Sequence, residues 1–140
     1  MDELKLENQL CFPFYSISRM IIRKYTPFLN ELGITYPQYL VLLVLWETDF
    51  QPVNDIAKKL YLQTNTITPL LQRLENLKII ERTKSETDER KTIISLSTKG
   101  HEMKLKALEI PYKLMEGINF PNEDLVQLRD QLKKMILLLQ

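Results

Sequence analysis

Cys11 is the residue of this chain that could carry redox chemistry, because it is the only cysteine among 140 residues. It lies in the segment LENQLCFPFY, residues 6–15, with Pro13 and Tyr15 shortly after it. Thiolates are nucleophilic and oxidisable, whereas most unpaired cysteines are buried and behave as small, inert hydrophobes. The segment alone leaves both interpretations of Cys11 open.

The choice depends on where the first helix begins. If it begins around residues 10–12, Cys11 lies at its N-terminus, where the helix dipole favours a thiolate and a proline is tolerated in the first turn. If it begins nearer residue 4, Pro13 lies inside the helix and kinks it, so the dipole supports Cys11 less.

A second group of side chains could read DNA. Asn and Gln pair with adenine, Arg pairs with guanine, and the Thr methyl group can meet a thymine methyl group. The segment TNTITPLLQRLE, residues 64–75, offers such groups on its expected outward face: Thr64, Asn65, Thr66, Thr68, Gln72 and Arg73. Residues 53–91 hold eight Lys or Arg against six Asp or Glu, so the electrostatic indication of DNA binding is weak.

Charged residues also flank a polar loop further along the chain. Lys84 and Arg90 lie at the two ends of the segment around ETDE, residues 86–89. We expect Arg90 to be able to enter a minor groove, with Asp88 orienting it.

The remaining polar residues do not form a catalytic pattern. His101 is the lone histidine and stands beside Glu102, without a cysteine or second histidine nearby, so we expect it to face solvent. With only three glycines, the sequence has no Gly-rich phosphate loop. We therefore expect no enzyme, no metal site and no cofactor.

Composition indicates one globular domain, with 44% hydrophobic and 26% charged residues and a net charge of +1. No apolar run approaches the roughly 20 residues of a membrane helix, and the N-terminus lacks the pattern of a signal peptide. A single cysteine cannot form an internal disulfide, so we expect a cytoplasmic, reduced protein without a membrane partner.

Hydrophobic periodicity predicts the elements that hold these side chains. A helix over residues 8–32 is expected to bend at Pro27 and to end at Gly33, and a buried helix with a Thr35–Gln38 capping box should follow. A short helix over 55–60, capped by Asn54, is separated by three residues from a second helix over about 64–77. Two helices joined by so short a turn predict a helix-turn-helix.

Two Ile- and Thr-rich segments, KIIERTKS at 78–85 and RKTIISLS at 90–97, predict a β-hairpin after these helices. The fold class is therefore mainly α with a small β-hairpin wing, a winged helix-turn-helix. Another helix should open at Ser97 or Thr98, with a kink at Pro111 and a weak point at Gly117.

The C-terminal segment predicts contact with a second chain. A helix capped by Asn122 carries an apolar seam with spacings of 3, 4, 3 and 4 residues: Leu125, Leu128, Leu132, Met135 and Leu139. Such a seam at the end of a small domain favours an obligate dimer.

The order of these elements resembles the MarR family of dimeric winged-helix repressors. The motifs that carry this resemblance are YLQTNTITPLLQRLE, DER and LSTKG. Three further segments look like the organic-hydroperoxide-sensing branch, the OhrR type: KLENQLCFPFY, KYTPFLNELGITYPQYLVLLVLWE and ERTKSETDERKTIISL. The resemblance implies one domain over 1–140, with dimerisation helices at about 1–35 and 98–140 and a winged helix-turn-helix at about 36–97.

The same resemblance implies a site shared by two subunits. Cys11 matches the reactive cysteine, and Tyr25 and Tyr36 match two tyrosines of the partner subunit that hydrogen-bond it. Tyr15 matches a further tyrosine near the pocket. In the DNA-binding part, Asp88 and Arg90 match a DxR pair with Arg90 in the groove, and Arg73 and Arg82 match basic contact positions.

The implied function is a redox-sensing repressor whose homodimer binds a pseudo-palindromic operator in double-stranded DNA. Organic hydroperoxide would oxidise Cys11 and release the DNA, and a low-molecular-weight thiol would pair with the product because no second cysteine exists. The segment QTNT at 63–66, where this branch often has DSGT, and Pro13 depart from the pattern.

Two alternatives remain open. The chain could be a MarR-type or global regulator released by a small aromatic ligand, phenolic or carboxylate, with Cys11 inert. It could also be a winged-helix interaction module that does not bind DNA.

Overall fold

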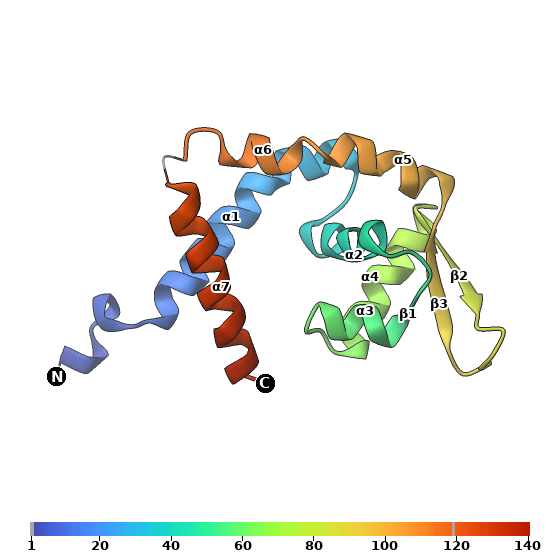
Figure 1. The fold of residues 1–140 in the computed structure, drawn as a ribbon, viewed down its shortest axis with the longest axis horizontal. Helices are drawn as coiled ribbons and strands as arrows, with labels where there is room; N and C mark the ends of the chain where they lie inside the picture. Colours follow the sequence, from blue (N-terminus) through green and yellow to red (C-terminus); the bar gives the residue numbers. More distant parts are fainter. Residues whose placement is uncertain (1, 119) are drawn as a thin grey trace.

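The computed structural model describes residues 2–118 and 120–140. It consists of helices with a small sheet at one end (Figure 1). Two short 3-10 turns, Asp2–Leu4 and Leu6–Asn8, precede the first helix. The helices are α1 (Cys11–Leu32), α2 (Tyr36–Glu47), α3 (Val53–Lys59), α4 (Thr64–Asn76), α5 (Thr98–Ala107), α6 (Ile110–Met115) and α7 (Asn122–Leu138). The strands are β1 (Gln51–Pro52), β2 (Ile80–Lys84) and β3 (Thr92–Leu96).

Helix α1 begins at Cys11, so Pro13 lies in its first turn, where a missing amide hydrogen costs no helical bond. The predicted start at residue 8 is therefore three residues too early. The helix continues past Pro27 and ends as predicted at Gly33, whose φ of 70° lies in the left-handed region that glycine adopts without strain.

Helix α2 forms the centre of the core. Thr35 and Gln38 make the predicted capping box, and the Thr35 amide donates to Gln38 Oε1 at 2.9 Å. Its buried side chains lie on most sides of the helix, as the apolar run predicts. They pack with apolar side chains of α3, α4 and the sheet, such as Ile56, Ile67 and Ile94.

Helices α3 and α4 form the predicted helix-turn-helix. The buried residues of α4 are Ile67, Leu71 and Leu74, and the predicted stripe member Leu70 is half-buried. The predicted cap at Asn54 is wrong, because α3 begins at Val53 and Pro52 is the capping residue. Pairing of Gln51–Pro52 with β3 extends the chain up to that point, so the helix starts directly after the strand.

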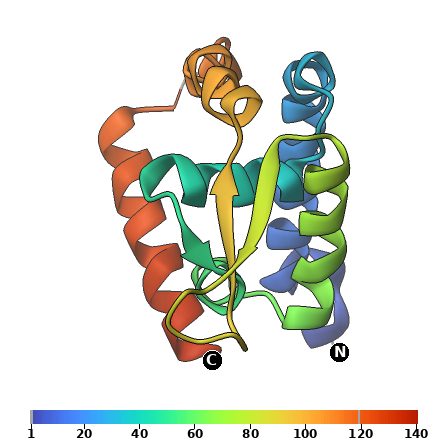
Figure 2. The ribbon, with the colours of Figure 1, turned by 90° about the vertical axis from the view of Figure 1, so that its right-hand side faces the viewer.

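Strands β2 and β3 form the predicted antiparallel hairpin, with Ile80 opposite Leu96 and Lys84 opposite Thr92. The two-residue strand β1 adds to the other edge of β3, so the sheet has the order β1-β3-β2. Figure 2 shows this sheet in front of α2, with α4 on one side and α7 on the other. The fold is a winged helix, with the β2–β3 hairpin as its wing.

The segment after the wing is divided more sharply than predicted. Ser97 caps α5 by accepting from the Gly100 amide at 3.1 Å. The kink expected at Pro111 is a complete break, because α5 ends at Ala107 and α6 begins at Ile110, with Pro111 in its first turn. Gly117 lies beyond α6 with a φ of 78°. The predicted cap at Asn122 is also wrong, since Pro121 is the capping residue of α7.

Helices α1 and α7 present apolar side chains to solvent. They overlap in Figure 1 but lie on opposite sides of Figure 2. Within α7, whose residues the structure describes throughout, no side chain is buried, and Leu128 of the predicted seam is 44% exposed. On α1, Phe12, Phe14 and Ile17 are exposed. Large exposed apolar surfaces mark places where another molecule packs, and a single copy of this chain leaves the apolar faces of α1 and α7 open to solvent.

Among the described residues, no single helix has the length and hydropathy to cross a membrane. Helices α1 and α2 together pass this criterion, but they are bent by 71° and α2 is largely buried in the core.

Gly100→Ala is expected to destabilise the fold by about 1–3 kcal/mol, because the added Cβ would collide with the backbone carbonyl of Ile79. Urea unfolding measures this loss. Thr98→Ala, an exposed change two positions earlier in α5, is the control and should unfold within about 0.5 kcal/mol of wild type. Equal stability of the two variants would contradict the close approach of α5 to Ile79.

Candidate functional site

Cys11 is the first residue of α1, and its side chain is exposed. The structure therefore realises the first of the two helix starts considered above, with the thiol at the N-terminal end of a helix. Tyr15 lies one turn further along the same face. Its hydroxyl accepts a hydrogen bond from Arg19 Nη1 at 3.3 Å, and the Arg19 guanidinium lies 5.3 Å from the centre of its ring.

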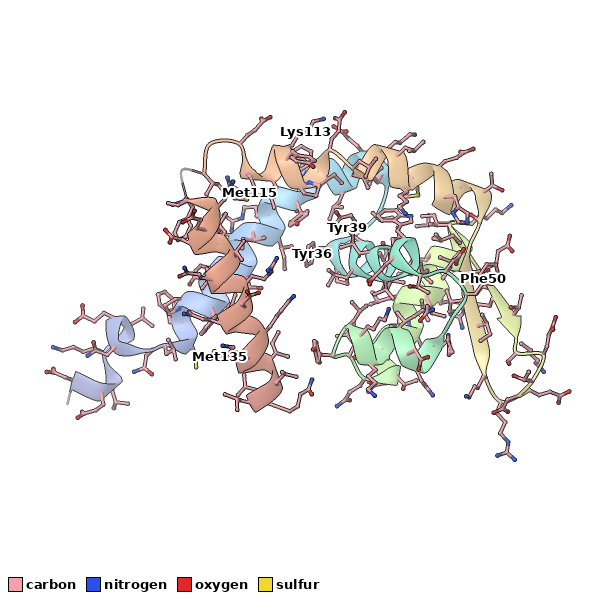
Figure 3. The ribbon with its side chains drawn as sticks, in the orientation of Figure 1. Tyr36, Tyr39, Phe50, Lys113, Met115 and Met135 are labelled. Carbon is pink, nitrogen blue, oxygen red and sulfur yellow. The ribbon has the colours of Figure 1, made fainter. Side chains whose placement is uncertain are left out.

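Tyr25 and Tyr36 lie together where α1 meets α2. Their ring centres are 4.9 Å apart. A third tyrosine, Tyr39, completes the cluster at 5.7 Å from Tyr25 and 6.3 Å from Tyr36. Figure 3 shows Tyr36 and Tyr39 close together on α2.

The tyrosine cluster holds its hydroxyl groups protonated. Burial, with additional repulsion from Tyr36 and Tyr39, raises the pKa of Tyr25 to about 12. Burial also raises the pKa of Tyr36, and burial together with Tyr36 raises that of Tyr39. Tyrosine hydroxyl groups are protonated donors at neutral pH in any case, and the raised pKa values extend this to higher pH.

Cys11 cannot reach the tyrosines of its own chain. Tyr25 follows Cys11 by 14 residues on the continuous helix α1, which corresponds to about 21 Å along the helix axis. Tyr36 contacts Tyr25 and therefore lies at the same distant end. A contact between the thiol and these hydroxyl groups requires a second copy of the chain.

The high pKa of Tyr25 predicts a pH dependence of stability. Its contribution is fully present below the ordinary value of 10.0 and is lost as the pH rises toward about 12. The free energy of unfolding should therefore fall across this interval, and it should fall less in Tyr25→Phe than in Tyr112→Phe, which changes an exposed tyrosine. Urea titrations at several pH values measure it, and equal slopes in the two variants would refute the prediction.

Helix α4 presents its predicted DNA-binding residues to solvent. Exposed side chains along it are Thr64, Asn65, Thr66, Thr68, Gln72 and Arg73. Several of them make hydrogen bonds within the helix, including one from Thr66 Oγ1 to Asn65 Oδ1 at 3.4 Å. Thr68 Oγ1 donates to the Thr64 carbonyl at 2.7 Å, and Gln72 Nε2 donates to Asn76 Oδ1 at 3.2 Å.

The charged residues of the wing differ in how far they are exposed to solvent. Lys84 and Arg90 are exposed, and Asp88 Oδ1 accepts from the Arg90 backbone amide at 3.1 Å. Asp88 thus shapes the loop through the backbone. Arg82 is largely buried, with Nε 3.1 Å from Glu75 Oε2. Its Nη2 is buried and makes no hydrogen bond with the residues that the structure describes.

A cavity of about 380 Å³ lies between the start of α3, helix α4 and the wing. Thr64 and Thr68 line it from α4, Asn54 from α3, and Arg82 and Arg90 from the wing. The structure thereby brings four of the predicted DNA-binding residues together. The others, Asn65, Thr66, Gln72, Arg73 and Lys84, lie outside this cavity, and Asp88 lies in the loop beyond it.

Sequence reasoning missed three residues near these groups. Tyr39 joins the tyrosine cluster, and Trp46 lies on the same face of α2. Asp49 accepts the Leu96 amide at 2.9 Å and lies 3.3 Å from the exposed His101. The spacing Tyr36–Tyr39 was a usable signal for Tyr39, whereas the partners of Trp46 and Asp49 lie far away in the sequence.

Comparisons with known proteins agree on one class. The chain is 46% identical over 131 residues to the organic hydroperoxide resistance transcriptional regulator of Bacillus subtilis (strain 168), covering 94% of this chain and 89% of that protein. It is 34% identical to the HTH-type transcriptional regulator SarZ of Staphylococcus epidermidis, covering 94% and 88%.

Solved structures agree as well. Reduced AbfR bound to DNA matches with a TM-score of 0.82 and 34% identity, over 99% of this chain and 96% of that one. The Staphylococcus aureus MepR–DNA complex matches with a TM-score of 0.81 and 28% identity, over 91% and 96%. Fold and relatives thus define a winged-helix DNA-binding transcriptional regulator of the MarR type, a class of proteins that are not enzymes.

Residues 23–107 match the family described as Transcriptional regulator SarA/Rot. The chain belongs to this family of transcriptional regulators.

Proposed function

We propose that this chain is a cytoplasmic, homodimeric repressor that leaves its operator when organic hydroperoxide oxidises Cys11. The observation that carries the proposal is the exposed thiol on the first residue of α1, in a regulator that has no other cysteine. The Bacillus subtilis relative, an organic hydroperoxide resistance transcriptional regulator, supports the response to hydroperoxide. The structure of reduced AbfR bound to DNA supports DNA binding in the reduced state.

In this proposal the two copies meet through the segments of about 1–35 and 98–140, around winged helices at about 36–97. The exposed apolar faces of α1 and α7 support that division. The second copy brings its tyrosine cluster to Cys11, because the cluster of the same chain lies about 21 Å away along α1. Tyr15 lies beside Cys11 on the same helix face, and Tyr25 and Tyr36 of the partner subunit donate hydrogen bonds to the sulfur.

The proposed oxidation of Cys11 requires a hydroperoxide and a small thiol but no cofactor. The Cys11 thiolate attacks the terminal, hydrogen-bearing oxygen of the hydroperoxide, the O–O bond breaks, and the alkoxide leaves as an alcohol after taking a proton. The product is a sulfenic acid. A low-molecular-weight thiol then condenses with it to give a mixed disulfide and water. The larger adduct no longer fits among the tyrosine hydroxyl groups, so the subunits shift.

DNA binding in this proposal uses both winged helices of the dimer. Their recognition helices would enter successive major grooves about 34 Å apart, which matches a pseudo-palindromic operator. Asn65, Thr66 and Gln72 would face bases, with Thr64, Thr68 and Arg73 near the backbone. Arg90, shaped by Asp88, would insert into the minor groove, flanked by Lys84 and Arg82.

An apolar cavity gives a second candidate function some support. A space of about 600 Å³ lies between α2 and α5–α6, lined by Tyr39, Leu43, Trp46, Leu108 and Tyr112 among others. A small aromatic ligand bound there could release the DNA while Cys11 stays inert. The Cys11→Ser variant considered below separates the two functions.

Arg90→Ala tests the DNA-binding half of the proposal. Its affinity for the DNA upstream of the protein's own gene should fall by about 1–3 kcal/mol, and the salt dependence should weaken by about one counterion per wing. Gel shifts over a range of salt concentrations measure both quantities. Lys106→Ala removes one positive charge from α5 and should leave both unchanged.

Two results would contradict this half. Equal affinities and salt slopes for Arg90→Ala and wild type would show that the wing does not contact DNA. Failure of the wild-type protein to shift the DNA at any salt concentration would favour an interaction module.

A further inference from the structure

We propose that Tyr39 and Trp46 are positioning residues that connect the sensor tyrosines to the winged helix. Through them, a displacement of Tyr25 and Tyr36 reaches the joint between the recognition helix and the wing. This inference rests on the proposed function, since it concerns how oxidation of Cys11 changes DNA affinity. Neither residue belongs to the site predicted from the sequence.

The first connection is aromatic. Tyr39 is only 3% exposed, and its ring packs at 5.7 Å from Tyr25 and 6.3 Å from Tyr36. Since side chains in a protein core pack as densely as organic crystals, the two sensor rings cannot move far without moving Tyr39. A displacement of Tyr25 and Tyr36 therefore displaces Tyr39 as well.

The second connection runs along α2. Trp46 lies two turns after Tyr39 on the same helix face, with ring centres 6.1 Å apart and planes at 70°. Such an edge-to-face arrangement is favourable and directional. A shift of Tyr39 thus acts directly on the indole of Trp46.

The third connection fastens Trp46 to α5 in two directions. The indole Nε1 donates to the Gly100 carbonyl at 2.9 Å. In return, Lys104 Nζ donates to the Trp46 carbonyl at 2.8 Å, at the C-terminal end of α2. The end of α2 and the first turn of α5 are therefore held as one unit.

Through Gly100, Trp46 is connected to α4 and the wing. Its backbone packs so closely on the Ile79 carbonyl that a side chain cannot be placed between them. Ile79 lies between the end of α4 and the start of β2, and its carbonyl accepts the Ser97 amide at 3.0 Å. A displacement of α5 at Gly100 must therefore also move Ile79, which joins α4 to the first strand of the wing.

The experiment compares the ratio of the DNA dissociation constants of the oxidised and reduced full-length protein. The probe is the DNA upstream of the protein's own gene, the oxidant is cumene hydroperoxide with a small thiol, and intact mass reports the state of Cys11. Tyr39→Leu removes the aromatic contacts, whereas Tyr39→Phe keeps the ring. Trp46→Phe keeps an aromatic ring and removes the hydrogen bond to Gly100. Phe50→Leu, an exposed aromatic outside these contacts, is the control.

We expect the ratio to fall about tenfold in Tyr39→Leu and in Trp46→Phe, within the usual range of coupling between two sites. Tyr39→Phe and Phe50→Leu should keep the wild-type ratio. Reduced-state affinity and the extent of Cys11 oxidation should stay within about twofold of wild type in all variants, because a purely structural role would change these first.

The outcomes separate this inference from the proposed function. If wild type oxidised at Cys11 binds DNA as tightly as reduced wild type, the proposed function fails, and the inference fails with it. If wild type responds and Trp46→Phe responds to the same degree, only the connection through α2 is refuted. Should Tyr39→Leu fail to bind DNA when reduced, Trp46→Phe decides, since it keeps Tyr39 and an aromatic ring beside it.

Discussion

Cys11→Ser is expected to bind operator DNA as tightly as wild type and to keep it in the presence of organic hydroperoxide. Serine retains the size and the hydrogen-bonding capacity of the side chain at the start of α1, but it cannot form a sulfenic acid or a mixed disulfide. Wild type should lose affinity by a factor on the order of ten to one hundred under the same treatment. The difference between the two proteins is thus a complete loss of the response.

Fluorescence anisotropy with labelled DNA, with and without cumene hydroperoxide plus a small thiol, measures this difference. Phe50→Leu, an exposed change outside the sensor site and outside the proposed dimerisation segments, is the control and should respond as wild type does. Undiminished hydroperoxide sensitivity of Cys11→Ser would mean that another group is the sensor. Release by a small phenolic ligand, equal in Cys11→Ser and wild type, would favour the ligand-binding alternative.

Leu132→Asp is expected to dissociate the proposed dimer and to reduce DNA affinity by at least on the order of one hundredfold, because a monomer engages one half-site. Leu132 is half-buried in α7, in the middle of the apolar seam that leaves Leu128 44% exposed. A partner that covers this seam would bury the new carboxylate without a counter-charge, which costs several kcal/mol.

Sedimentation velocity and the anisotropy titration measure the two effects. Gln131→Asp places the same charge on the neighbouring, exposed position of α7 and should remain dimeric. A Leu132→Asp protein that sediments as a dimer would show that α7 does not form the interface. A wild-type monomer that binds DNA tightly would remove the need for the second copy.

Strong local signals made much of the fold predictable. Gly33 ends α1 because its backbone is left-handed there, and the Thr35–Gln38 box starts α2. Both depend on residues close together in the sequence. The turn before α4 has four residues where three were predicted, because α3 ends at Lys59. This short turn and the Ile-rich strands are equally local signals, which is why the winged helix could be inferred.

The predicted helix caps were wrong where two nearby residues could each begin the helix. Asn54 and Asn122 are good capping residues, but Pro52 and Pro121 precede them and already hold the extended backbone that a cap requires. Strand β1 has only two residues, too few for any alternation, and exists because Gln51 pairs with Ile94.

The candidate site was predictable only in part. Composition and spacing identified Cys11 as a possible reactive group, but they left the start of α1 open, and the structure places it at Cys11 itself. Tyr25 and Tyr36 entered through the family resemblance, since each alone looks like a core aromatic. The contacts of Trp46 with Gly100 and of Arg82 with Glu75 join different elements, so no local pattern could indicate them.

The most direct test of the account is to follow the mass of Cys11 and the DNA-bound fraction in the same samples as limiting organic hydroperoxide is added with a small thiol. We predict that the fraction of DNA released rises in step with the fraction of Cys11 carried as the mixed disulfide. DNA that is released while Cys11 remains a free thiol, or DNA that stays bound when every Cys11 carries the adduct, would contradict the account.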